Sequence, residues 1–270
     1  VAGLWVFVVQ TATSEHPFFH RDLAKDTNFI GTTIFSFFTG VLLFSTTALL
    51  PSFMQNLLGY SAIQSGIASM PRGIGSLFSF LMVPFLVSRL GARAVLTIGI
   101  VISIASLWMM AKFDTMMTSE LIMVSGYIQG AGTGLLFAPM STLAFATLSQ
   151  SHRVEGTILS TMARTLGSSV GISVVQAMVL RDSALAHTVL SSGIDPSSPM
   201  LHAILPPFMD PRTASGAAAL NGEVTRQASM IGYVDVFSWM TLFTLLMLPL
   251  ILILKPAPPL SAQSREVHAD

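Results

Sequence analysis

The sequence predicts an all-α membrane protein with six transmembrane helices, preceded by the end of a truncated helix. Two observations support this prediction. Of the 270 residues, 52% are hydrophobic and only 10% are charged, whereas soluble domains carry about 25% charged residues. In addition, the chain contains six long apolar runs, most of which exceed the roughly 18 residues that indicate a spanning helix. Lipid is therefore expected to surround much of the chain.

The predicted elements follow one another in a simple order, with ends uncertain by several residues. Residues 1–9 form an apolar stub, interpreted as the end of a helix whose start is missing, and residues 10–28 form a polar connector. Five spans lie within 29–180, a long loop covers 181–231, a final span covers 232–255, and residues 256–270 form a tail. A short surface helix is expected in the alanine-rich part of the long loop, residues 213–230. The apolar runs themselves cover residues 29–54, 63–87, 95–111, 121–148, 158–180 and 236–254.

The distribution of Lys and Arg predicts the orientation of these spans. If the connector 10–28 is cytoplasmic, that side of the membrane also holds the short loops near Arg89 and Arg153 and the tail. It then carries more positive residues than the opposite side, where most of them fall in the long loop. Because cytoplasmic loops are enriched in Lys and Arg, we expect both the connector and the tail in the cytoplasm. The chain is then a multi-pass protein of the inner or plasma membrane.

Three ionisable residues lie in or at the start of apolar runs: Arg164, Arg72 and Asp235. A charge at the centre of a bilayer costs about 3 kcal/mol on insertion scales, so such residues usually face protein or water and mark transport pathways. Arg164 and Arg72 either face a cavity or extend to the membrane surface. Proline and glycine residues around Arg72 predict a broken, cavity-lining helix.

Asp235 and Gln129 complete the predicted substrate-pathway residues. Asp235 starts the final span, where it could pair with Arg72 or bind a cation or a proton. The alternative is a carboxylate at a helix N-terminus, favoured by the helix dipole. Gln129 is a polar side chain between glycines within the fourth span. It is therefore a candidate to line the same pathway.

Glycines predict where the helices touch. Gly126, Gly130 and Gly134 recur at four-residue spacing in the fourth span, and Gly167 and Gly171 repeat the pattern in the fifth. Membrane helices associate through small residues that let backbones approach closely. Any polytopic bundle could show such stripes, so they predict packing rather than a particular function.

The sequence offers no constellation for catalysis or for a cofactor. It lacks cysteine, and its formal net charge is zero, which disfavours a thiol site and a nucleic-acid partner. His16 and His20 are four residues apart, but Pro17 lies between them and no third metal ligand follows. A phosphate-binding GxxxxGK[ST] loop is also absent. We therefore expect no enzyme activity, cofactor or metal site.

Five short motifs occur in a recognisable order. They are Leu-Gly-Tyr-Ser-Ala (58–62), Ser-Arg-Leu-Gly-Ala-Arg (88–93), Gln-Gly-Ala-Gly-Thr-Gly (129–134), Arg-Thr-Leu-Gly-Ser-Ser-Val-Gly (164–171) and Tyr-Val-Asp-Val-Phe (233–237). Together they resemble the C-terminal part of the 14-span drug:proton antiporters of the major facilitator superfamily, the EmrB/QacA type. The resemblance implies that the six spans form the second bundle of such a transporter. Arg89, Gly91 and Arg93 then belong to its cytoplasmic loop motif, although Ser88 replaces the acid of that motif.

The same resemblance implies a function for the complete protein. It would export amphipathic, often cationic compounds in exchange for protons by alternating access, and this chain alone would be inactive. The expected partners are the lipid bilayer, an N-terminal bundle that carries the proton-binding carboxylates, the substrate, protons and a periplasmic adaptor. Two alternatives stay open: an exporter of another substrate class, such as siderophores or metabolites, and a non-transporting membrane scaffold or receptor module.

Overall fold

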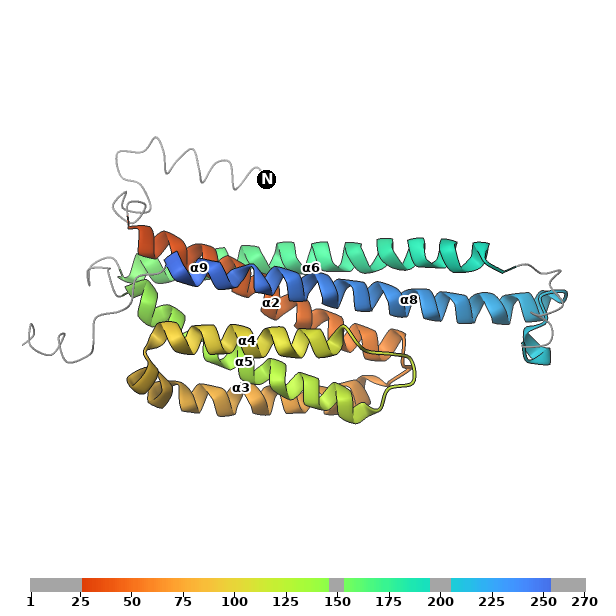
Figure 1. Cartoon of the computed structure of the whole chain (residues 1–270), viewed down its shortest axis with the longest axis horizontal. Helices are drawn as coiled ribbons and strands as arrows, with labels where there is room; N and C mark the ends of the chain where they lie inside the picture. Colours follow the sequence, from red (N-terminus) through yellow and green to blue (C-terminus); the bar gives the residue numbers. More distant parts are fainter. Residues whose placement is uncertain (1–25, 146–152, 195–204, 254–270) are drawn as a thin grey trace, which may run out of the picture.

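The computed structural model describes residues 26–145, 153–194 and 205–253, and these form an elongated helical bundle (Figure 1). The predicted truncated helix 1–9, almost all of the connector 10–28 and the tail 256–270 lie outside the described residues. Among the described residues, six helices are long and apolar enough to cross a membrane. The predictions of an all-α fold and of six membrane-spanning helices are therefore confirmed.

The helices follow the apolar runs of the sequence. They are α2 (Thr27–Asn56), α3 (Ala62–Leu90), α4 (Ala92–Met110), α5 (Ser119–Phe145), α6 (Arg153–Ser192), the short 3-10 helix η2 (Pro207–Met209), α8 (Ala214–Leu245) and α9 (Met247–Ile253).

Local sequence explains where several helices begin and turn. The side chain of Asp26 caps α2 by accepting hydrogen bonds from the backbone N–H groups of the first turn. Ser61 and Gln64 form a reciprocal capping box at the start of α3. Gly91, the single residue between α3 and α4, has a φ of 84°, a conformation that glycine adopts without steric cost. These signals produce short connections and antiparallel neighbours.

Two predicted features differ from the structure, and the first is the break in the second span. Helix α3 continues without interruption through Pro71 and Pro84. Proline removes one backbone hydrogen bond, but membrane helices tolerate this where neighbouring helices pack around the freed carbonyl. Gly75 does not loosen the helix but allows close packing, because an added Cβ there would meet the backbone oxygen of Tyr127 on α5.

The second difference concerns the predicted long loop 181–231, which is largely helical. Helix α6 has 40 residues and continues to Ser192 because the first helix-breaking residues after its apolar run are Gly193 and Pro196. The helix expected in residues 213–230 is present but is continuous with the final span, as α8. Figure 1 shows that α6 and α8 project side by side beyond the other helices. The end of an apolar run is therefore not the end of the helix.

The final span contains one interruption. Helix α8 ends at Leu245 and α9 begins at Met247. Pro249 explains the interruption, because its ring clashes with the carbonyl four residues earlier, that of Leu245.

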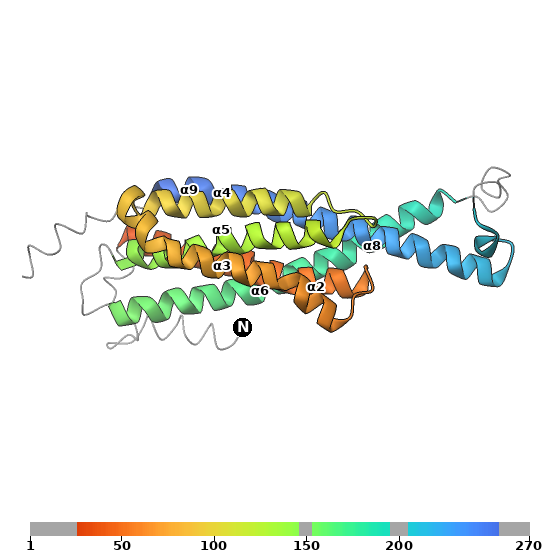
Figure 2. The same ribbon diagram turned by 90° about the horizontal axis from the view of Figure 1, so that it is seen from below.

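Helix pairing divides the bundle into a packed interior and an uncovered side. Helix α3 packs on α5, α2 on α6, α4 on α5, and α6 on α8. Figure 2 shows α4 and α9 along one edge and α6 along the opposite edge. In the most apolar window of each span, 50% of α2 and 56% of α5 are buried, but only 17% of α3 and of α6. Helices α3 and α6 therefore present apolar faces that the other described residues leave uncovered.

Candidate functional site

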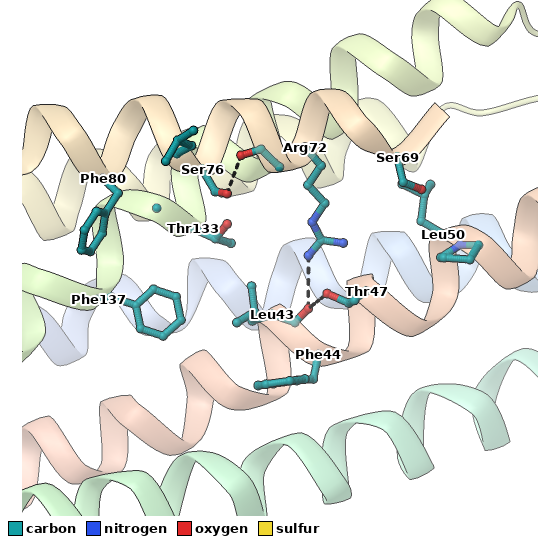
Figure 3. A pocket seen from close by; sticks show the side chains of 14 residues that line it. Leu43, Phe44, Thr47, Leu50, Ser69, Arg72, Ser76, Phe80, Thr133 and Phe137 are labelled. Carbon is teal, nitrogen blue, oxygen red and sulfur yellow. Dashed lines mark hydrogen bonds between the residues drawn. The ribbon is translucent and has the colours of Figure 1, made fainter. Parts of the chain in front are cut away.

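A cleft between α2, α3 and α5 is the candidate functional site (Figure 3). Its volume is about 660 Å³, which lies within the range of about 300–1,000 Å³ typical of small-molecule pockets. Its wall is mostly apolar, and Arg72 is its one charged lining residue among those described. The aromatic side chains of the wall are Phe44, Phe80 and Phe137, and its hydroxyl groups belong to Thr47, Ser69, Ser76 and Thr133.

Arg72 extends from α3 across the cleft toward α2 (Figure 3). Its Nη2 donates to the backbone oxygen of Leu43 at 3.2 Å and to the hydroxyl oxygen of Thr46 at 3.0 Å. Within the described ranges, no carboxylate lies at ion-pair distance from its guanidinium. Arg72 therefore lines the cleft and is held by α2.

Arg164 lies beside the same cleft. It belongs to α6, and its Cζ lies 5.4 Å from the centroid of the Phe137 ring, which lines the cleft from α5. A cation over an aromatic face at this distance is worth about 0.5–1 kcal/mol. As at Arg72, no carboxylate of the described segments is at ion-pair distance. Phe137 therefore links the two arginines: it lines the cleft together with Arg72 and contacts the guanidinium of Arg164.

Gln129 is completely buried in α5. Neither its Nε2 nor its Oε1 has a hydrogen-bond partner among the residues that the structure describes. A buried polar group without a partner costs about 1–3 kcal/mol, which an apolar side chain of similar size would avoid. Thr133, one turn later on the same helix face, lines the cleft and donates to the backbone oxygen of Gln129 at 2.9 Å. Gln129 is thus adjacent to the cleft rather than exposed in it.

Four of the five predicted packing glycines lie at close helix contacts. An added Cβ at Gly130 would meet the backbone of Arg72, and one at Gly134 would meet that of Ser76, both on α3. On α6, a Cβ at Gly167 would meet the backbone oxygen of Phe37 of α2. The equivalent atom at Gly171 would lie 2.8 Å from the Cα of Val41 of α2. The glycines of α5 therefore face α3, and those of α6 face α2.

Gly126 differs from the other four. An added Cβ would lie 3.8 Å from the nearest atom, the Cβ of Arg72, which is an ordinary van der Waals distance. Of the three glycines expected to pack closely in α5, Gly130 and Gly134 do so and Gly126 does not.

Two segments of the chain, around Arg72 and around Arg164, are similar in sequence, a feature that was not predicted above. Residues 70–76 read Met-Pro-Arg-Gly-Ile-Gly-Ser and residues 162–168 read Met-Ala-Arg-Thr-Leu-Gly-Ser. The contacts repeat as well. Gly130 of α5 packs on the backbone of Arg72, and Gly40 of α2 packs on the backbone of Arg164. Comparison of the sequence with itself would have drawn attention to this similarity, since internal repeats are common in transporters.

Asp235 does not occupy the predicted position at the start of a helix. It lies well inside α8, which begins at Ala214, so the proposed interaction with a helix dipole does not apply. The predicted pair with Arg72 is also absent, because Arg72 bonds to α2 and helices α3 and α8 do not contact each other. Asp235 is exposed, and its nearby ionisable group is another acid, Asp182 of α6.

The predicted loop motif connects three helices. The guanidinium of Arg89 lies 4.3 Å from the ring centroid of Phe85. Gly91 makes the turn into α4, and Arg93 Nε donates to the backbone oxygen of Ile251 of α9 at 3.0 Å. Arg93 thus fastens the start of α4 to the end of the final span.

No group of three or more His, Asp or Glu side chains that could hold a metal occurs among the described residues. The cleft therefore offers a surface for a small molecule: one cation, several hydroxyl groups and aromatic rings. It contains no set of side chains arranged for catalysis within the same ranges.

Comparison with protein families identifies the family of this chain. The model described as the Major Facilitator Superfamily matches residues 3–172 of this chain, which is more than half of its length.

Comparison with curated proteins gives relatives of similar description. The chain is 26% identical over 265 residues to "Probable multidrug resistance protein EmrY" of Escherichia coli K12, covering 95% of this chain and 51% of that protein. It is 25% identical over 252 residues to "Fatty acid resistance protein FarB" of Neisseria gonorrhoeae, covering 93% and 50%. It is 27% identical over 273 residues to "Multidrug export protein EmrB" of Haemophilus influenzae, covering 97% and 52%. The chain thus spans about half the length of the curated relatives it matches.

Proposed function

This chain belongs to the Major Facilitator Superfamily, and from that premise we propose that it acts as one half of a proton-coupled exporter of amphipathic compounds. It is a multi-pass protein of the inner or plasma membrane, and its relatives are named for multidrug resistance and export. The observation that supports the proposal most is the position of the cleft, which opens beside the uncovered apolar face of α3.

A second bundle would cover this side of the chain. Most of the apolar surface of α3 and α6 is exposed, including Leu77 and Phe80 at 62% and 56%. Transporters of this architecture bind substrate near the membrane midplane, between two halves that rock against each other. In the proposed arrangement, α2, α3 and α5 supply one wall of the substrate cavity and the second bundle supplies the other.

The close glycine contacts suit this motion. They allow α3 to pack on α5, and α6 on α2, with backbones in direct contact. Each pair can then move as a rigid unit. We propose that the Arg89–Arg93 motif and its contact with α9 stabilise one of the two alternating states. The proton-binding carboxylates would belong to the second bundle, since the cleft wall contains no acid among the residues described.

Reconstitution tests this proposal. The protein expressed from its full reading frame is placed in liposomes with a pH gradient, and a panel of amphipathic compounds is added while proton movement is followed with a pH-sensitive dye. We expect substrate-dependent proton movement with the full protein and none with residues 1–270 alone. Export that persists unchanged without a proton gradient would contradict proton coupling. Export by residues 1–270 alone would contradict the division into two halves.

The same preparation distinguishes the alternatives. Export of siderophores or metabolites, but not of amphipathic compounds, would identify a different substrate class. Absence of transport for every compound, together with specific binding of a protein partner, would favour a scaffold or receptor.

A further inference from the structure

Arg72 retains unused hydrogen-bonding capacity in the cleft. A guanidinium has five N–H donors, and both hydrogen bonds that Arg72 makes to described residues come from Nη2, to Leu43 and Thr46. Its Nε and Nη1 hold no hydrogen bond to any described residue. Figure 3 shows the guanidinium directed into the space between α3 and α2. The side chain is therefore positioned by α2 and still able to bind another group.

The charge of the cleft wall is entirely positive. Arg72 is the one charged lining residue among those described, and the guanidinium of Arg164 lies 5.4 Å from the ring centroid of the lining residue Phe137. An unpaired cation in an apolar cleft is unfavourable unless an anion approaches it. A guanidinium matches carboxylate geometry well, and its hydrogen bonds to a carboxylate are stronger than those between neutral groups.

The remainder of the wall suits an apolar chain. Phe44 of α2, Leu77 and Phe80 of α3 and Phe137 of α5 line the cleft beyond Arg72. They provide a continuous apolar surface within a volume of about 660 Å³, enough for a single extended ligand. A cationic head group at Arg72 would instead meet a like charge.

From these observations we propose that the cleft binds amphipathic organic carboxylates, with the carboxylate on Arg72 and the apolar chain along Phe80 and Phe137. The proposal rests on the proposed function, since it treats the cleft as part of the transport pathway. Arg164, whose guanidinium lies over the ring of the lining residue Phe137, adds a second positive charge near the same wall. The substrate head group is therefore anionic, in contrast to the often cationic compounds that the family resemblance implied.

The test compares three compounds of equal chain length: dodecanoate, dodecyltrimethylammonium and dodecanol. The full reading frame is expressed in cells that lack competing exporters, either unaltered or as the variant Arg72→Gln or Arg72→Lys. Arg226→Gln is the control, because it removes one positive charge outside the cleft. We expect Arg72→Gln to lower the initial rate of dodecanoate export at least tenfold. The rate of dodecanol export should change less than twofold in the same variant. Arg72→Lys keeps the positive charge but not the fork of N–H donors, so it should retain more dodecanoate export than Arg72→Gln and less than the unaltered protein. Arg226→Gln should retain all of it.

Three results would overturn the proposal. The first is faster export of dodecyltrimethylammonium than of dodecanoate by the unaltered protein. The second is an equal loss of export for all three compounds in Arg72→Gln despite normal size-exclusion behaviour, which would indicate a structural ion pair with another part of the protein. The third is loss of dodecanoate binding to the purified protein when phosphatidylglycerol is added to phosphatidylcholine nanodiscs, which would assign Arg72 to a lipid head group. If none of the three compounds nor any compound of the wider panel is exported, the proposed function itself fails.

Discussion

Gly130 and Gly126 form a matched pair for alanine substitution. They lie one turn apart on α5 and both face Arg72 of α3. A Cβ at Gly130 would run into the backbone oxygen of Arg72 and lie 2.8 Å from its carbonyl carbon, whereas a Cβ at Gly126 would lie 3.8 Å from its nearest neighbour. Only the first substitution therefore forces α3 and α5 apart.

The magnitude follows from two opposing effects. Alanine is favoured over glycine in a helix interior by about 0.8–1 kcal/mol, and this gain applies equally to Gly126→Ala and Gly130→Ala. Carbon atoms pack at about 3.5–4.0 Å, so the helices must separate by roughly 1 Å at Gly130. Such overpacking costs about 1–3 kcal/mol. The difference in stability between the two variants isolates this cost.

Thermal unfolding of the full-length protein in detergent measures the difference. Tryptophan fluorescence is suitable because Trp108 lies on α4 and Trp239 on α8. For a domain of this size, 1 kcal/mol corresponds to about 2–4 °C in Tm. Gly130→Ala should therefore melt roughly 2–12 °C below Gly126→Ala, which should melt at or above the unaltered protein. Melting of both variants at the same temperature would refute the glycine-mediated contact between α3 and α5.

Three further predictions concern single side chains. Gln129→Leu should raise Tm, because it removes a buried amide whose missing hydrogen bonds cost about 1–3 kcal/mol. The same variant should lower export if the amide belongs to the substrate pathway. A lower Tm would show that Gln129 has a structural partner. Thr213→Ala should destabilise the start of α8 by about 1 kcal/mol, because the Thr213 hydroxyl accepts from the backbone N–H of Gly216 at 3.0 Å. Faster amide hydrogen exchange in the first turn of α8 would support this, and unchanged exchange would count against it. Arg93→Gln should release α9, since it removes the 3.0 Å bond to Ile251, and exchange in residues 247–253 should rise while that of α3 stays constant.

The number and positions of the spans could be predicted from the sequence because hydrophobicity is a property of each segment alone. Each predicted apolar run overlaps a described helix, the last run overlaps both α8 and α9, and Gly91 of the predicted loop motif lies at the turn between α3 and α4. The ends of α6 and α8 could not be predicted in this way. Helix and hydrophobicity end at different residues there, because a helix can continue into water until Gly193 or a proline stops it.

The residues of the site could be singled out from the sequence, but their contacts could not. The sequence singled out Arg72, Arg164, Gln129 and a set of glycines, since charged, polar and very small residues are unusual in lipid. It did not show that Arg72 bonds to α2 or that Gly126 lies at an ordinary packing distance.

Membrane segments and unusual residues were thus determined by the amino-acid sequence alone, because transfer into lipid acts on each side chain independently. Which side chains meet was decided only by helix pairing, since a contact depends on the crossing of two backbones distant in sequence. The cleft between α2, α3 and α5, its positive charge and the buried Gln129 arise from that pairing.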